Sequence, residues 1–141
     1  MKRRPELSGL SSDHHTGLVL ARRARKAADG DDRMAQTEWQ RIVERFYTEL
    51  EPHFRVEEQA LLPALKEAGE AALVERTLHE HARLRTLVLE PTARHLSTFA
   101  NLLREHIRFE EQVLFQRTET LMDTEALARI AALYDAVRRT D

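Results

Sequence analysis

The chain contains two copies of one pattern: His53-Phe-Arg-Val-Glu-Glu-Gln-Ala-Leu-Leu62 and His106-Ile-Arg-Phe-Glu-Glu-Gln-Val-Leu-Phe115. In each copy a glutamate follows a histidine by four residues, which gives the pairs His53/Glu57 and His106/Glu110. On a helix, side chains four residues apart lie on one face, one turn apart. Each copy therefore directs an imidazole and a carboxylate to the same point, and both groups suit a first-row transition metal. The repeat indicates two halves of one metal-binding cage.

The composition predicts an all-α protein. The chain has 141 residues, which favours a single domain spanning residues 1–141. It contains only four glycines and four prolines, and the long stretches between them are rich in Ala, Leu, Glu, Gln and Arg, which favour helix. Cysteine is absent, which excludes disulfides, thiolate metal sites, iron–sulfur clusters and cysteine catalysis.

The charge pattern argues against a nucleic-acid or membrane partner. The formal net charge is −2, and acidic and basic residues are interspersed along the chain. The basic start Lys2-Arg3-Arg4 is not followed by an apolar run, and no stretch approaches transmembrane length. We therefore expect a cytoplasmic protein.

Capping residues, glycines and prolines divide the chain into four long helices and a shorter fifth one. The first is expected to follow a cap at residues 11–13, and the second to bend at Pro52, since proline removes a helical hydrogen bond. Pro91 is expected in the first turn of the fourth. Long amphipathic helices with short connections predict an antiparallel up-down four-helix bundle over about residues 12–122. The fifth helix, about residues 124–139, is expected to pack across one end or edge.

Two further histidines have the spacing expected of residues that face the bundle interior. His15 and His81 are each followed three residues later by a leucine, and side chains at this spacing share a helix face. His14 replaces His15 if the first helix is rotated by one residue. A lone histidine facing a core is more often a hydrogen-bonded core residue than a ligand, but the repeated carboxylates favour a shared site. The candidate metal ligands are His15, His53, Glu57, His81, His106 and Glu110.

With these motifs the chain resembles the hemerythrin-like family of His-His-Glu cation-binding domains. The resemblance rests on Asp13-His14-His15, on the two His-xxx-Glu-Glu-xx-Leu repeats and on Glu80-His81-xx-Leu84, and it covers about residues 13–122. It implies a four-helix bundle around two iron ions. It also implies roles for the candidate residues: Glu57 and Glu110 bridge the irons, His15 and His53 serve one iron, and His81 and His106 serve the other.

One departure from the family pattern bears on activity. Oxygen-carrying members have two histidines at i, i+4 spacing on the third helix, whereas in this chain Thr77 precedes His81 by four residues and Arg85 follows it by four. Neither side chain replaces an imidazole. His79 lies roughly 200° around the helix from His81. One iron is therefore expected to carry solvent or an open position, although Glu49 and His79 remain alternatives for completing the site.

The spacing of the repeat distinguishes this pattern from ferritin-like carboxylate proteins. Those proteins use Glu-xx-His at i, i+3, whereas Leu50 and Leu103 stand three residues before His53 and His106. The neighbours of the repeat glutamates, Glu58 and Glu111, are expected to be solvated or salt-bridged. A role in holding a histidine is the alternative for this pair.

These expectations lead to a functional hypothesis. We expect a non-haem di-iron protein that binds or reacts with oxygen, peroxide or nitric oxide, because an open coordination position admits small molecules. The alternatives are a non-catalytic iron- or oxygen-sensing module and a metal-binding or storage protein. The sequence does not decide whether the chain is an enzyme.

Overall fold

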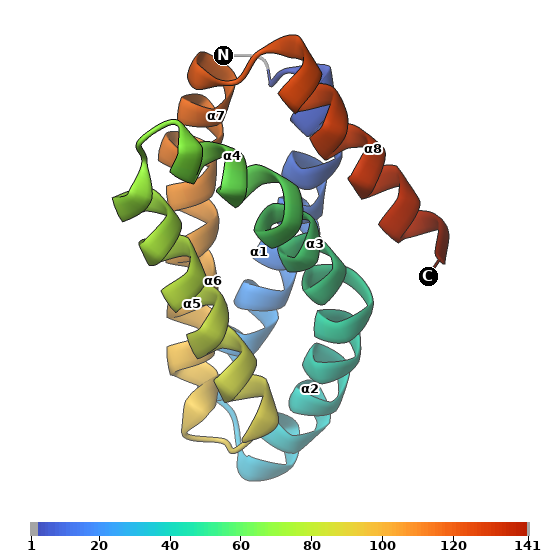
Figure 1. The fold of residues 1–141 in the computed structure, drawn as a ribbon. Helices are drawn as coiled ribbons and strands as arrows, with labels where there is room; N and C mark the ends of the chain where they lie inside the picture. The colour runs from blue at the N-terminus through green and yellow to red at the C-terminus, as the bar shows by residue number, and fades with distance from the viewer. Residues whose placement is uncertain (1–2, 141) are drawn as a thin grey trace.

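The computed structural model describes residues 3–140, and every regular element within this range is helical (Figure 1). This confirms the all-α prediction. In chain order, the helices form five continuous stretches: η1 (Pro5–Leu7) with α1 (Ser8–Ala28); α2 (Asp32–Arg45), η2 (Phe46–Leu50), α3 (Glu51–Val56), η3 (Glu57–Leu61) and α4 (Leu62–Glu67); α5 (Ala71–Leu89); α6 (His95–Phe109), η4 (Glu110–Leu114) and α7 (Phe115–Leu121); and α8 (Thr124–Thr140).

The breaks between the stretches follow from local chemistry. Asp31 caps α2, because its side chain accepts a hydrogen bond from the amide of Met34 at 2.8 Å. Gly69 adopts a φ of 95° between α4 and α5, a conformation that glycine reaches without a steric penalty. Two expected boundaries differ from the structure. Helix α1 begins at Ser8, ahead of the expected cap, and α6 begins at His95, so Pro91 lies in the preceding loop.

The long helical stretches lie side by side along roughly one direction, and α8 runs obliquely to them (Figure 1). Helix α1 packs on α6 and α2, and α5 packs on α6 and α4. Helix α8 contacts α3, η1, η3 and the start of the bundle at α1. In the described part of the chain, no helix is both long enough and apolar enough to cross a bilayer.

Pro52 is accommodated by a widened turn. The π-helical segment η2 ends two residues before it, and the helix continues through Pro52 into α3. Proline has no amide hydrogen, so carbonyls in the preceding turn lose helical partners. The guanidinium of Arg138 donates to two of these carbonyls, Thr48 O at 3.3 Å and Glu49 O at 3.1 Å. Because the helix resumes at once, His53 keeps its helical spacing to Glu57.

Two apolar clusters fill the interior, and a layer of buried polar residues lies between them. On α1, Leu10 belongs to one cluster and Leu20 to the other, with His14 between them. The same order recurs on α5, where His81 lies between Val74 and Leu84. The fold thus encloses a polar layer within an apolar core, an arrangement that costs free energy unless the polar groups are paired or bind an ion.

Candidate metal centre

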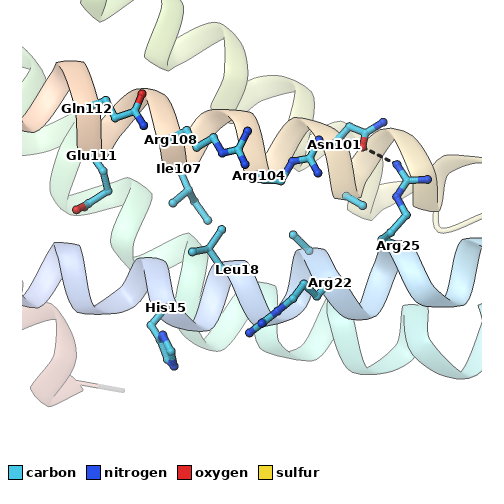
Figure 2. Close-up of a pocket in the computed structure, with 12 residues that line it drawn as sticks. His15, Leu18, Arg22, Arg25, Asn101, Arg104, Ile107, Arg108, Glu111 and Gln112 are labelled. Carbon is cyan, nitrogen blue, oxygen red and sulfur yellow. Dashed lines mark hydrogen bonds between the residues drawn. The ribbon is translucent and has the colours of Figure 1, made fainter.

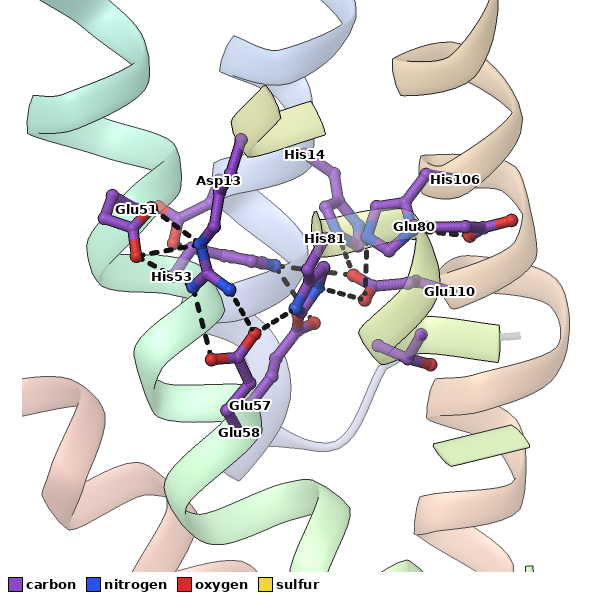
Figure 3. Close-up of polar contacts among 12 residues, drawn as sticks. Asp13, His14, Glu51, His53, Glu57, Glu58, Glu80, His81, His106 and Glu110 are labelled. Atoms are coloured by element: carbon purple, nitrogen blue, oxygen red, sulfur yellow. Dashed lines mark hydrogen bonds and ion pairs between the residues drawn. The ribbon is translucent and has the colours of Figure 1, made fainter. Parts of the chain in front are cut away.

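Four histidines and two glutamates form the polar layer, which we call the cage. Its members are His14, His53, Glu57, His81, His106 and Glu110. Each is at most 4 % exposed. They make two groups of four, His14/His53/Glu57/Glu110 and Glu57/His81/His106/Glu110, and within each group the possible ligand atoms lie within 4.8 Å of one another. Figure 3 shows the imidazoles converging from different helices on the two carboxylates.

Each cage carboxylate presents one oxygen to each pair of histidines. Glu110 Oε1 lies 2.8 Å from His14 Nε2 and 3.4 Å from His53 Nε2, while its Oε2 lies 3.1 Å from His106 Nε2. Glu57 is arranged in the same way: its Oε2 lies 3.0 Å from His53 Nε2, and its Oε1 lies 3.0 Å from His81 Nε2. Both carboxylates therefore span the two groups, and this is the arrangement that bridging ligands need.

The repeated sequence also forms a repeated local structure. Glu57 opens the π-helical segment η3 and Glu110 opens η4. In each segment the turn closes over five residues, because the amide of Leu62 donates to Glu57 O and that of Phe115 donates to Glu110 O. Single π-helical turns within α-helices are frequent at functional sites.

The structure corrects the expectation for the first helix, because His14 and not His15 lies in the cage. His14 is 4 % exposed, whereas His15 is exposed. Figure 2 shows His15 projecting from the side of α1 that faces away from α6. The physical reason is close helix packing: Gly17 faces α6, where an added Cβ would lie 2.7 Å from Ile107 Cδ1. Leu18, which suggested the His15 face, is 36 % exposed.

The other expected ligands come together as the sequence predicted. His53, Glu57, His81, His106 and Glu110 all contribute atoms to the two groups. Two residues weighed as extra ligands lie elsewhere: His79 is exposed, and Glu49 pairs with Arg138.

Thr77 faces the bundle interior on α5, one turn before His81. It is fully buried, and its hydroxyl donates to Leu73 O at 2.8 Å.

Every cage histidine has a second carboxylate at its outer nitrogen. The distances from Nδ1 to the carboxylate oxygen are 3.0 Å for His53 and Asp13, 2.7 Å for His14 and Glu111, 2.6 Å for His81 and Glu58, and 2.7 Å for His106 and Glu80. A carboxylate accepts a hydrogen bond from Nδ1–H, which keeps the proton on Nδ1 and leaves Nε2 free to act as a ligand on the inner side. The acids expected to be solvated, Glu58 and Glu111, therefore hold histidines instead.

Each outer carboxylate is in turn paired with an arginine. The pairs are Arg138 with Asp13 at 2.7 Å, Arg3 with Glu111 at 3.5 Å, Arg85 with Glu58 at 2.8 Å and Arg76 with Glu80 at 3.1 Å. The pKa values of Asp13, Glu58, Glu80 and Glu111 are all lowered, because the hydrogen bonds to their histidines, with a smaller contribution from the arginines, outweigh the opposing effect of burial. Asp13 and Glu80 were not expected in this role, because only the folded chain brings them to His53 and His106.

The electrostatics of the cage favour cations. Burial by itself lowers the pKa of His81, but the carboxylates of Glu110, Glu57 and Glu58 outweigh it and raise the pKa to about 10. Burial is also outweighed at His106, where Glu110 and Glu80 raise the pKa to about 9. Glu110 responds in the opposite direction: burial alone raises its pKa, but the surrounding histidines hold it well below the usual range. The anionic centre thus attracts protons, and a metal ion can replace them.

Four cage atoms make no hydrogen bond of good geometry among the described residues, although they face each other in two pairs at 3.0 and 3.1 Å. They are Glu57 Oε1, His81 Nε2, His106 Nε2 and Glu110 Oε2, and all four belong to the second of the two groups. A buried polar atom without a partner costs free energy. The donor set of imidazole nitrogens and carboxylate oxygens suits iron, manganese, zinc and copper. The residues present therefore fit a metal site.

Comparison with protein families agrees with this geometry. The model of the hemerythrin HHE cation-binding domain matches residues 6–118. The match covers most of the chain and all six cage residues, so the chain belongs to the hemerythrin HHE cation-binding domain family. Helix α8 lies beyond the matched region. Comparison with curated proteins and with solved structures gives no match.

Proposed function

We propose that the cage holds two iron ions bridged by carboxylates and that this centre binds or reacts with a small ligand, namely oxygen, peroxide or nitric oxide. The observation that carries the proposal is the position of Glu57 and Glu110, each with one oxygen toward each histidine pair. His14 and His53 would hold one ion, and His81 and His106 the other. Two shared anions offset the repulsion between neighbouring cations.

The protein supplies orientation, charge and exclusion of water. The outer carboxylates fix the imidazole tautomers, so that each Nε2 faces inward without a proton when an ion is bound. Apolar clusters on both sides keep the centre away from bulk solvent. When bound, a pair of iron ions supplies the redox chemistry that small oxygen and nitrogen species require, and such chemistry proceeds better in a site that excludes competing water.

The presence of Thr77 favours a reactive centre over one in which the protein fills every coordination position. It occupies the helix position one turn before His81, and its hydroxyl is bonded to a backbone carbonyl. Its side chain therefore offers no imidazole to the His81/His106 ion, which we propose keeps a position for an exogenous ligand. We also propose that the four long helical stretches form an antiparallel up-down bundle, with α8 as a fifth helix added to it.

Metal analysis after anaerobic loading with ferrous iron tests the proposal. We expect about two irons per chain and, after oxidation, magnetic coupling between them. Optical spectra recorded with oxygen, peroxide and nitric oxide then distinguish a reactive centre from a storage site. Saturation at one iron or fewer per chain contradicts the dinuclear assignment. Two irons whose spectra are unchanged by all three ligands favour a storage role.

A further inference from the structure

Helix α8 lies outside the matched family region, yet it reaches a residue that holds a cage histidine. Arg138 Nη2 lies 2.7 Å from Asp13 Oδ1, and the Tyr134 hydroxyl donates to the same oxygen at 3.1 Å. The other oxygen of this carboxylate, Asp13 Oδ2, lies 3.0 Å from His53 Nδ1. One carboxylate thus connects α8 to a candidate metal ligand on α3.

Arg138 also contacts the helical turn that carries His53. Its guanidinium donates to Thr48 O and Glu49 O, the carbonyls released by the turn before Pro52, and lies 3.4 Å from the Glu49 carboxylate. Its side chain is 22 % exposed, and that of Asp13 is 9 % exposed. Arg138 therefore binds both the backbone of the turn that precedes His53 and Asp13, the acid that orients the His53 ring.

The position of α8 is itself well defined by packing. Leu127 and Ile130 are fully buried in the apolar cluster that includes Leu7 and Leu10. The Tyr134 ring lies directly over Gly9, where an added Cβ would lie 2.4 Å from Cε1 of the ring. The absence of a side chain at Gly9 is what lets the tyrosine approach α1 and reach Asp13.

We propose that Arg138 and Tyr134 are positioning residues for the metal centre, which act through Asp13 to orient His53. This inference rests on the proposed function, since it concerns the ion held by His14 and His53. Groups that hold a metal-ligating histidine from behind commonly contribute about 10- to 100-fold to metal affinity.

The proposed effect should fall on one of the two ions. The His81/His106 ion is held through Glu58 and Glu80. The arginines paired with these two acids, Arg85 and Arg76, lie on α5 and not on α8.

Cobalt(II) provides the test, because it takes the same ligands as iron, is not oxidised by air under mild conditions and makes nearby protons visible by paramagnetic shifts in NMR. The full-length chain is titrated with cobalt(II) as wild type and as the variants Arg138→Gln, Arg138→Lys and Tyr134→Phe. The matched control is Arg139→Gln, which removes the next, exposed arginine of α8.

We expect wild type to bind two cobalt ions and to show four exchangeable histidine Nδ1–H resonances, one for each outer carboxylate. In Arg138→Gln, one ion should bind about tenfold more weakly, and one resonance should shift or exchange faster with solvent. Arg138→Lys should fall between this variant and wild type, because an ammonium keeps the charge but not the planar fork that joins Asp13 to the two carbonyls. Tyr134→Phe keeps the ring over Gly9 and should give a change of a few fold, and Arg139→Gln should behave as wild type.

Three outcomes contradict the proposal in distinguishable ways. If Arg138→Gln binds both ions as wild type does and keeps all four resonances, the positioning role is wrong and the proposed function stands. If Arg138→Gln and Tyr134→Phe lose helicity and both ions together, α8 supports the fold and does not position His53. If wild type takes up no cobalt or iron, the proposed function fails and this inference fails with it.

Discussion

The Nε2 atom of His14 lies 2.8 Å from Oε1 of Glu110, which joins the first helix of the chain to the second copy of the repeated motif. This contact assigns the first-helix position in the cage to His14. It also accounts for one oxygen of Glu110, whose other oxygen faces the His81/His106 pair. Glu110 thus joins the two halves of the cage, and Glu57 joins them in the same way.

His14→Ala should remove about one equivalent of bound metal, whereas His15→Ala should bind as wild type does. His14 offers Nε2 to the cage from a buried position, and His15 is exposed on the other side of α1. Metal analysis of the reconstituted proteins measures the difference. The reverse pattern would place the first-helix ligand one residue later and require a different rotation of α1.

Glu57→Ala and Glu110→Ala should each prevent formation of the metal pair. Both side chains face the two histidine pairs at once, so each truncation removes a donor from both ions. Glu58→Ala and Glu111→Ala should be milder, with affinity reduced about 10- to 100-fold, because these acids act through a histidine. The exposed Glu105→Ala serves as a control that should change nothing. Equal losses in all four cage and outer-acid variants, measured by titration, would show that the assigned helix faces are wrong.

The metal-free protein should lose stability as the pH rises from about 6.5 to about 10. The folded-state pKa values of His81 and His106, about 10 and about 9, lie above the usual value of 6.5. Their protonated forms therefore stabilise the fold below pH 6.5, and this contribution is lost as the pH rises through the folded-state values. We expect the free energy of unfolding, measured by urea denaturation, to fall by several kcal/mol over this range, at about 1.4 kcal/mol for each unit by which a folded-state pKa exceeds 6.5. The metal-loaded protein should show a smaller fall, since an ion then replaces the protons. A metal-free protein whose stability is unchanged or increases up to pH 10 contradicts the prediction.

Thr77→His should add a nitrogen donor on the face of α5 that carries His81. Thr77 is fully buried one turn away from His81, so an imidazole there points to the same side of the cage. In the diferric wild type we expect azide to produce new charge-transfer absorption, and in Thr77→His we expect azide to bind several-fold more weakly while the iron content is kept. Thr77→Val, which keeps the size and removes the hydroxyl, is the control and should bind azide as wild type does. Identical azide affinities in wild type and Thr77→His would mean that this position does not adjoin the exchangeable site.

Much of the cage was predictable because its spacing is local. A helix places residues four apart on one face whatever surrounds it, so His53 with Glu57 and His106 with Glu110 could be paired from the sequence alone. His81 could be added because Leu84, three residues on, shares its apolar face and is fully buried. The helix pattern could be read for the same reason, since periodicity and capping depend on near neighbours.

The rotation of α1 was decided by tertiary packing. Periodicity ranks Leu18 above Gly17 for an interior position, but α1 approaches α6 so closely that the face with Gly17, Ala21 and Ala24 is the one that fits. This close approach turns His14 inward and leaves His15 outside. The cost of a steric overlap between two helices is not visible in the sequence of either one.

The surroundings of the histidines were decided by tertiary structure as well. Asp13 holds a histidine forty residues away, Glu80 holds one from a neighbouring helix, and Arg138 reaches the site from the end of the chain. The sequence by itself determined which side chains share a helix face, because that follows from the 3.6-residue turn. Only the folded chain determined which faces meet, because contacts between helices depend on how the whole set of side chains fills one interior.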